Sequence, residues 1–186
     1  MLASPLMPSD RNLALIGPMG AGKSTLAASL GDLLGLRVRD LDREIEAASG
    51  DTIACLFERF GEAHFRAQEN AMLDSLLVSE AQVIACGGGV VLASRNRELL
   101  AANAFVVWLD APLELLERRL RDSDSRPLLR APDLGARLAE LAAQRDPLYA
   151  EVADLKFAVT DLPPVEQTAK LAQRLPGHWM RGMRSV

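Results

Sequence analysis

Short apolar runs, rich in Leu, Ile and Val, alternate with longer amphipathic segments along most of this chain. Runs of four to six such residues are typical of buried strands. Strands are predicted at residues 13–16, 82–86 and 104–109, and at 36–39 and 155–159, where basic residues interrupt the apolar ones. The segments between them place apolar residues at helical spacing. They predict helices at residues 22–34, 43–48, 53–60, 62–79, 94–102, 112–121, 133–145 and 164–175. The alternation predicts an α/β fold whose parallel sheet is covered by helices on both faces.

Glycine, proline and one acidic residue mark where several elements should end. Gly61 is expected to interrupt the helical region between residues 53 and 79. Pro147 is expected to end or bend the helix that begins at Asp133. Asp110 closes an apolar strand and precedes Ala-Pro, so we favour a helix cap over a metal ligand at this position.

A glycine-rich segment at residues 17–25, GPMGAGKST, follows the first predicted strand and opens the first predicted helix. In this context the pattern G-x-x-x-x-G-K-[ST] is typical of a phosphate-binding loop. Its glycines let the backbone approach a polyphosphate, whose charge the helix N-terminus attracts. Lys23 adds a charge near the β- and γ-phosphates, and the Ser24 hydroxyl can ligate Mg²⁺. The sequence therefore predicts a nucleoside triphosphate site.

Two further motifs follow predicted strands. Asp40 and Asp42 end the second strand and point roughly the same way. One carboxylate can serve the Mg²⁺ shell while the other orients an acceptor hydroxyl and takes its proton, although a solvated turn beside Arg43 is the alternative. The triple glycine at residues 87–89 suits backbone that packs closely against a ligand, or a tight turn. Since parallel strands end at one edge of a sheet, both motifs should meet the phosphate loop there.

The composition excludes several classes of function. With 186 residues the chain fits one domain, and its net charge of −4 offers no surface made for nucleic acid. No apolar run is long enough to span a membrane, and residues 1–11, a predicted loose leader, lack the form of a secretory signal. Cys55 and Cys86 stand apart among apolar neighbours, which favours buried thiols in a cytoplasmic protein. His64 and His178 have no Cys or His companions, so a zinc site is not expected.

Six segments together distinguish this chain among phosphate-loop proteins. In order they read GPMGAGKST, DLD, GEAHFRAQE, GGG, SRPLL and QRDPLY, and the Asn-Lys-x-Asp loop typical of GTPases is absent. Over about residues 12–170 their order and spacing resemble those of bacterial shikimate kinases, P-loop kinases of the nucleoside monophosphate kinase structural family. The resemblance implies a three-layer α/β/α fold with a five-stranded parallel sheet. It also implies a kinase domain at residues 12–175, with an acceptor-binding helical subdomain at about 42–70, a mobile lid at about 121–133, and an appendage of unassigned role at 176–186.

The resemblance further implies roles for individual residues. Asp42 would bind the acceptor hydroxyls as the candidate base, and Asp40 would lie near the Mg²⁺ water shell with Ser24. Arg66 and Arg145 would hold the carboxylate of shikimate, for which a planar guanidinium is suited. The other substrate-binding positions would be Glu69, Gly87, Gly88 and Gly89. The nucleotide-binding positions would be Gly20, Ala21, Gly22, Lys23, Ser24, Thr25, Arg119 against the adenine ring, and Arg126 in the lid. The catalytic group would comprise Asp42, Lys23 and Arg126.

The sequence leaves some alternatives open. Arg66 and Glu69 are three residues apart and could form a surface helix pair, and Arg119 could lie on a solvated helix face. Many family members have a second arginine where this chain has Ala67. The implied reaction is phosphorylation of the shikimate 3-hydroxyl by ATP with Mg²⁺, by a cytoplasmic monomer without nucleic-acid or membrane partners. Its rivals are a kinase for gluconate or a nucleotide, and a regulatory module that binds the same ligands without turnover.

Overall fold

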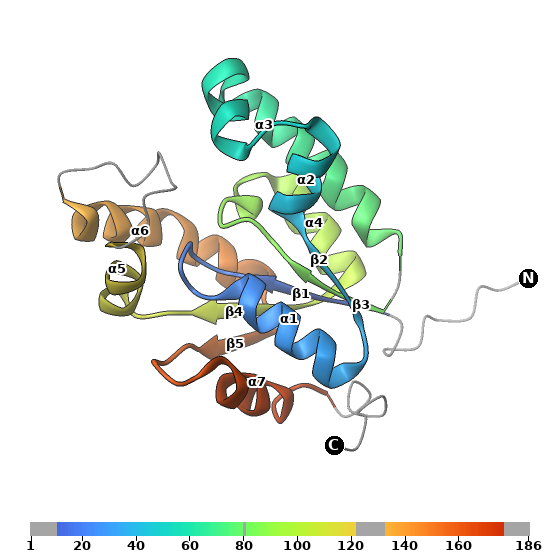
Figure 1. Cartoon of the computed structure of the whole chain (residues 1–186), viewed down its shortest axis with the longest axis vertical. Coiled ribbons are helices and arrows are strands. Elements are labelled where there is room, and N and C mark those ends of the chain that lie inside the picture. The colour runs from blue at the N-terminus through green and yellow to red at the C-terminus, as the bar shows by residue number, and fades with distance from the viewer. Residues whose placement is uncertain (1–10, 80, 122–132, 177–186) are drawn as a thin grey trace, which may run out of the picture.

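The computed structural model describes residues 11–79, 81–121 and 133–176, and the sheet within them has five strands. The strands are β1 Asn12–Ile16, β2 Arg37–Asp40, β3 Gln82–Ala85, β4 Ala104–Asp110 and β5 Leu155–Ala158. Their order is β2-β3-β1-β4-β5, so β1 lies at the centre (Figure 1). Every neighbouring pair runs parallel. The predicted five-stranded parallel sheet is therefore confirmed.

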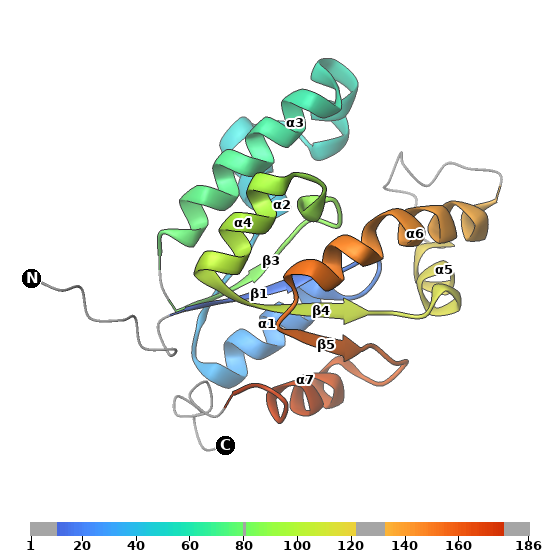
Figure 2. The ribbon, with the colours of Figure 1, turned by 180° about the vertical axis from the view of Figure 1, so that it is seen from behind.

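Helices cover both faces of the sheet, as the alternation of elements predicted. They are α1 Lys23–Leu34, α2 Leu41–Ser49, α3 Ile53–Leu77, α4 Ser94–Asn103, α5 Leu113–Arg121, α6 Leu134–Val152 and α7 Pro164–Ala172, with a short 3₁₀ helix, η2, at Val90–Leu92. Helices α1 and α7 pack together on one face (Figure 1), whereas α4 and α6 lie on the other (Figure 2). Helix α2 and the first half of α3 stand beyond the edge of the sheet.

Strand β1 shows how one short segment builds the core on both faces. All five of its residues are buried. Leu13 and Leu15 join the hydrophobic cluster beneath α1 and α7, whereas Ala14 and Ile16 join the cluster beneath α3 and α4. This division follows because successive side chains of a strand point to opposite faces. The glycine-rich loop after β1 therefore leaves from the buried centre of the sheet.

Glycine and proline had different effects on the two longest helices. Gly61 interrupts α3 as predicted, with a non-helical φ of 79° and ψ of 173°. Helix α6 instead continues through Pro147 to Val152, so an end at this proline, one of the two outcomes expected there, is wrong. Beyond the proline, Tyr149 and Val152 are buried in the core. Burying two such side chains at about 1.5–3 kcal/mol each offsets the roughly 3 kcal/mol that an internal proline costs.

Asp110 does not cap the helix that follows it, contrary to expectation. It ends β4, and α5 begins three residues later at Leu113. Its carboxylate forms an ion pair with Lys156 on β5, with an N–O distance of 3.0 Å. The backbone carbonyl of Pro112 accepts the first helical N–H, from Leu115. The acidic side chain is thus used to join two strands at the sheet edge.

Several expectations concern residues outside the described ranges. These are most of the leader at 1–11, most of the lid at 121–133 with Arg126, and all but the first residue of the appendage at 176–186. Within the part of the chain that the structure describes, no helix is long and apolar enough to cross a lipid bilayer.

Candidate active site

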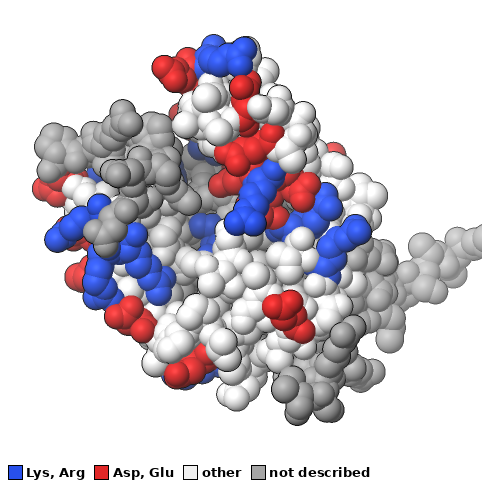
Figure 3. Space-filling model, in the orientation of Figure 1, with Lys and Arg blue, Asp and Glu red and all other residues white. Residues whose placement is uncertain are grey.

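The carboxyl ends of β1, β2 and β3 converge on one cleft, because the three strands run in the same direction. The cleft has a volume of about 590 Å³, and its lining includes residues 19–26, Asp40, Asp42, Gly88 and Arg119. Figure 3 shows a hollow between the lobe of α2 and α3 and the body of the molecule, with side chains of both charges around it. The predicted meeting of the phosphate loop, the two acids and the triple glycine is confirmed.

The loop between β1 and α1 has a backbone that depends on glycine. Three of its residues have φ values that L side chains rarely adopt, Gly17 at 136°, Gly20 at 83° and Gly22 at 91°. A Cβ at Gly17 would also lie 2.6 Å from the carbonyl oxygen of Leu109 on β4. Lys23 begins α1, and its Nζ donates to the carbonyls of Gly17 and Pro18 at 2.9 and 2.8 Å. The lysine charge therefore lies directly over the loop.

Ser24 and Asp40, the two residues expected near Mg²⁺, contact each other. The hydroxyl of Ser24 donates to Oδ2 of Asp40 at 2.6 Å. The other carboxylate oxygen, Oδ1, accepts from the backbone N–H of Arg43 at 3.3 Å, which makes Asp40 the N-cap of α2. One carboxylate thus joins the first turn of α1 to the first turn of α2.

Asp42 lies on the first turn of α2 rather than at the end of β2, so the expectation that both acids end the strand is wrong for Asp42. It faces the first residue of the triple glycine. A Cβ at Gly87 would lie 2.8 Å from Oδ1 of Asp42 and 3.0 Å from Oε1 of Glu69, so only glycine leaves room for both carboxylates. Glu69, on α3, is 1% exposed. Burial raises the pKa of Glu69 against the opposing charge of Arg66, and the nearby Asp42 adds to the rise. The two acids are thus close neighbours in a partly desolvated environment.

Arg66 lies against the last residue of the triple glycine. Its Nη1 donates to Oε2 of the buried Glu69 at 2.8 Å, and its Nη2 pairs with the exposed Glu62 at 3.1 Å. A Cβ at Gly89 would lie 2.5 Å from Nη2 and 2.8 Å from Cζ of this guanidinium. Because Glu69 is buried, the alternative of a surface helix pair is wrong.

Arg145 reaches the middle of the same loop from α6. Its Nη1 donates to the carbonyl oxygen of Gly88 at 3.3 Å, and the hydroxyl of Tyr149 donates to the same oxygen. The Nε of Arg145 is buried and has no hydrogen-bond partner among the described residues. The triple glycine is thus flanked by carboxylates at Gly87, by two side-chain donors at Gly88, and by a guanidinium at its third residue.

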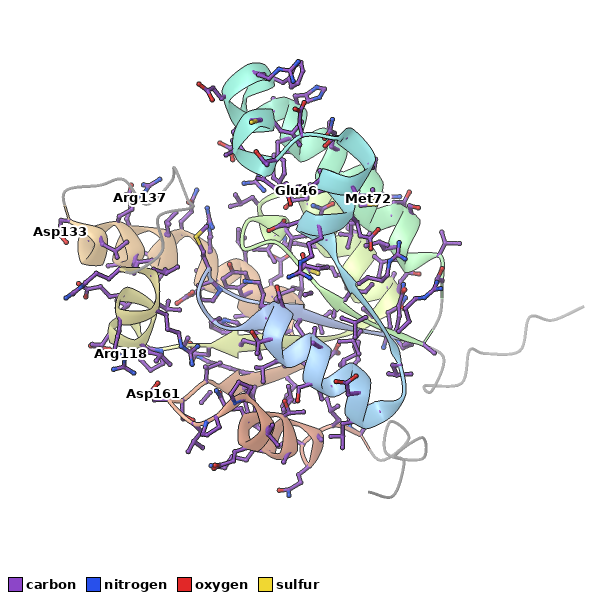
Figure 4. The ribbon with its side chains drawn as sticks, in the orientation of Figure 1. Glu46, Met72, Arg118, Asp133, Arg137 and Asp161 are labelled. Atoms are coloured by element: carbon purple, nitrogen blue, oxygen red, sulfur yellow. The ribbon has the colours of Figure 1, made fainter. Side chains whose placement is uncertain are left out.

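Arg119 lies at the other end of the cleft, where it contacts backbone rather than solvent alone. It donates to the carbonyls of Gly20 at 3.1 Å and Thr160 at 3.4 Å. The preceding residue, Arg118, pairs with Asp161 at 2.6 Å, and Figure 4 shows these two side chains facing each other between α5 and the loop before α7. Three more residues line this end, Leu162, Pro164 and Gln167. Arg119 is thus half-buried, with contacts that a purely solvated helix face would not provide.

Two buried polar residues were not singled out from the sequence: Gln167, which lines the cleft, and Tyr149, which bonds to the triple glycine beside it. Tyr149 belongs to the QRDPLY segment, which could have pointed to it, but no role was assigned to its hydroxyl. Gln167 accepts from the backbone N–H of Thr160 at 3.3 Å and donates to the carbonyl of Leu162 at 2.9 Å. No motif or spacing marks Gln167, because the helical pattern there predicts only an amphipathic helix.

Comparison with known proteins agrees with this geometry. Residues 19–176 match the family model described as shikimate kinase. A shikimate kinase from Halorhodospira halophila is 48% identical over 146 residues, covering 78% of this chain and 82% of that protein. One from Xanthomonas euvesicatoria is 42% identical over 168 residues, covering 90% and 93% of the two chains.

Structural similarity extends over the same region. The structure of shikimate kinase from Acinetobacter baumannii in complex with shikimate matches with a TM-score of 0.86 at 38% identity. The match covers 90% of this chain and 93% of that one. From the family model, the sequence relatives and this structure together, it follows that the chain belongs to the shikimate kinase family.

Proposed function

We propose that this chain transfers the γ-phosphoryl group of ATP to the 3-hydroxyl of shikimate, giving shikimate 3-phosphate and ADP in the biosynthesis of aromatic amino acids. One observation carries the proposal: the phosphate loop, Asp40 and Asp42 line one cleft, and two arginines lie against the triple glycine whose middle residue borders that cleft. Phosphoryl transfer to an alcohol that bears a carboxylate needs each of these groups. The loop binds the donor, the arginines bind the acceptor, and an acid orients the nucleophile.

The acceptor is proposed to lie between α2, α3, α6 and the triple glycine. Arg66 and Arg145 hold its carboxylate through charge-assisted hydrogen bonds, which fix orientation as well as position. Glu69 supports this contact, because its 2.8 Å ion pair fixes the guanidinium of Arg66. Asp42 then orients the 3-hydroxyl and takes its proton as the new phosphorus–oxygen bond forms. The backbone of residues 87–89, against which the side chains of Asp42, Glu69 and Arg66 pack, is proposed to line the same pocket.

The nucleotide is proposed to lie along the rest of the cleft. Loop N–H groups and the N-terminus of α1 bind the phosphates, and Lys23 exchanges its loop carbonyls for phosphate oxygens. Arg119 packs against the adenine ring. Arg126, outside the described residues, is proposed to close over the phosphates from the lid at 121–133 and to help exclude water. Catalysis is then positioning and charge stabilisation, without a covalent enzyme intermediate.

The oxygens of Ser24 and Asp40 fit a Mg²⁺ ion that is held mainly by phosphate and water. Both are hard oxygen donors lining the cleft, and they lie 2.6 Å apart. Mg²⁺ usually takes one or two protein groups together with substrate phosphates and keeps several waters. Among the described residues no group of three or more His, Cys, Asp or Glu could hold a metal by itself. When bound, Mg²⁺ supplies positive charge that neutralises the phosphate oxygens.

A coupled ADP-release assay tests this function against its rivals. Shikimate, gluconate, AMP and CMP are offered in turn with ATP and Mg²⁺. ADP release that depends on shikimate alone supports the proposal, whereas dependence on another acceptor assigns a different small-molecule kinase. Binding of ATP and shikimate without ADP release would indicate a regulatory module.

The same function implies a domain organisation, a location and an oligomeric state for the chain. Residues 42–70 form the acceptor-binding part of a kinase domain at residues 12–175. Cys55 and Cys86 are free thiols, which supports a cytoplasmic location. The protein is expected to act as a monomer with small-molecule ligands only, and light scattering coupled to size-exclusion chromatography tests its oligomeric state.

A further inference from the structure

Tyr149, the only tyrosine of the sequence, makes a buried polar contact at the edge of the proposed acceptor site. The residue is 0% exposed, and its ring lies against that of Trp108 with centroids 5.8 Å apart. Its hydroxyl donates to the carbonyl oxygen of Gly88, the oxygen that also accepts from Nη1 of Arg145. A tyrosine placed only for packing would not need this bond, since phenylalanine fills nearly the same volume.

The shared carbonyl links Tyr149 to the behaviour of Arg145. A carbonyl oxygen has two lone pairs, and here two side-chain donors use them. Without the tyrosine hydroxyl, Arg145 would be the remaining side-chain donor on this oxygen and would be drawn closer than its present 3.3 Å. A guanidinium held tightly by a backbone carbonyl is poorly aligned for the carboxylate of a ligand, which prefers two parallel N–H groups.

The bond also orients the peptide that follows Gly88. No peptide bond in the described residues is cis, so the N–H of Gly89 points opposite to the Gly88 carbonyl. With that carbonyl directed at α6, the N–H of Gly89 points away from α6. Burial raises the pKa of Tyr149 against the opposing charge of Arg145, so the hydroxyl stays protonated and remains a donor at neutral pH.

Resting on the proposed function, we infer that Tyr149 is a positioning residue: it holds the carbonyl of Gly88 so that Arg145 keeps its guanidinium aligned for the carboxylate of shikimate. The tyrosine does not touch the substrate in this inference and acts only through Arg145. The effect should therefore appear in shikimate binding and leave nucleotide binding unchanged.

The test begins with Tyr149→Phe, which removes the hydroxyl and keeps the ring. The KM for shikimate should rise by about 2–10-fold, the range for losing one hydrogen bond, while the KM for ATP stays unchanged. Thr168→Val is the control for removing a buried hydroxyl without breaking a hydrogen bond. Thr168 on α7 is 3% exposed, and its hydroxyl has no hydrogen-bond partner among the described residues. This substitution should leave both KM values unchanged. Shikimate turnover by the unmodified protein, measured alongside, separates failure of this inference from failure of the proposed function.

A double-mutant cycle distinguishes positioning from a merely structural role. If Tyr149 acts through Arg145, the rise in KM caused by Tyr149→Phe should disappear in an Arg145→Lys background. The methyl ester of shikimate, which lacks the charged carboxylate, should show no rise either. An equal rise in the KM values for shikimate and ATP would overturn the inference, as would the same fold-change in both backgrounds. Loss of the folded circular dichroism spectrum in Tyr149→Phe would overturn it too, since the hydroxyl would then serve the fold.

Discussion

The substitution Gly89→Ala should damage the acceptor site while leaving the fold intact. Gly89 has φ of −100° and ψ of 2°, a backbone that residues other than glycine can also adopt. Its new Cβ would lie 2.5 Å from Nη2 of Arg66, whereas ordinary contact begins at 3.4 Å. The guanidinium must therefore retreat by the difference, about 0.9 Å. Only the end of a flexible side chain has to move, so the fold should persist. The loss of unfolding free energy should not exceed the contribution of a hydrogen bond to a charged group, about 1.5–3 kcal/mol.

The movement of the Arg66 guanidinium should also weaken shikimate binding. It disturbs the 2.8 Å pair between Arg66 and Glu69 and takes the guanidinium out of line with the substrate carboxylate. A hydrogen bond to a charged group contributes about 1.5–3 kcal/mol. Since about 1.4 kcal/mol corresponds to a factor of ten in affinity, losing one such bond should raise the KM for shikimate about 10–100-fold.

Steady-state kinetics with varied shikimate and saturating ATP, together with the melting temperature, measure both effects. Gly50→Ala is the control for a loss of stability that leaves the acceptor site unchanged. Gly50 ends α2 with φ of 74°, and nothing lies within 4 Å of its Cβ position, so alanine there is strained but not crowded. This control should lose about 1 kcal/mol of stability and keep the normal KM. A normal KM for shikimate in Gly89→Ala would refute the reasoning about Arg66.

Four further predictions concern individual groups of the site. Asp42→Asn should lower kcat by about 10²–10⁴-fold because an amide cannot take the proton; near-normal turnover would exclude this base. Asp40→Asn keeps the cap of α2, yet it should raise the Mg²⁺ concentration for half-maximal rate by about tenfold; an unchanged Mg²⁺ titration would argue against the proposed ligand. Arg126→Ala should lower kcat at a nearly constant melting temperature, since it acts on transition-state charge, and an equally large loss of stability would contradict that role. Glu69→Gln removes a carboxyl whose pKa burial raises above its ordinary value of 4.5. A raised pKa favours the protonated form in the folded state, so its contribution to stability is present below pH 4.5 and is lost as pH rises through the folded pKa. The difference in melting temperature, unmodified protein minus Glu69→Gln, should therefore decrease as pH rises. A difference that does not depend on pH would refute the raised pKa of Glu69.

The order of the elements was predictable because each signal is local. Apolar runs such as residues 13–16 and 104–109 lie within the strands that form. The phosphate loop at residues 17–25 was predictable from its glycines, from Lys23 and Ser24, and from the strand and helix on either side. The grouping of Asp40 and Asp42 with the triple glycine followed from one topological rule, that parallel strands end at the same edge.

What could not be predicted depends on packing between distant segments. The extension of α6 through Pro147 reflects burial of Tyr149, which no local propensity describes. The use of Asp110 to pair with Lys156 depends on the alignment of β4 with β5. Gln167 meets the loop before α7 only in the folded chain. These contacts depend on strand register and on burial in the folded chain, so local sequence patterns cannot predict them.

Asp40 both caps α2 and accepts a hydrogen bond from Ser24. These two contacts restrict insertions in the segment between Asp40 and Asp42. Asp42 follows two residues later on the same helical turn. An extra residue between the two acids would turn the second one by about 100° around the helix axis. Its carboxylate would then leave the side facing Gly87, even if the cap formed again. Insertions between these acids should therefore abolish phosphorylation in an otherwise folded protein.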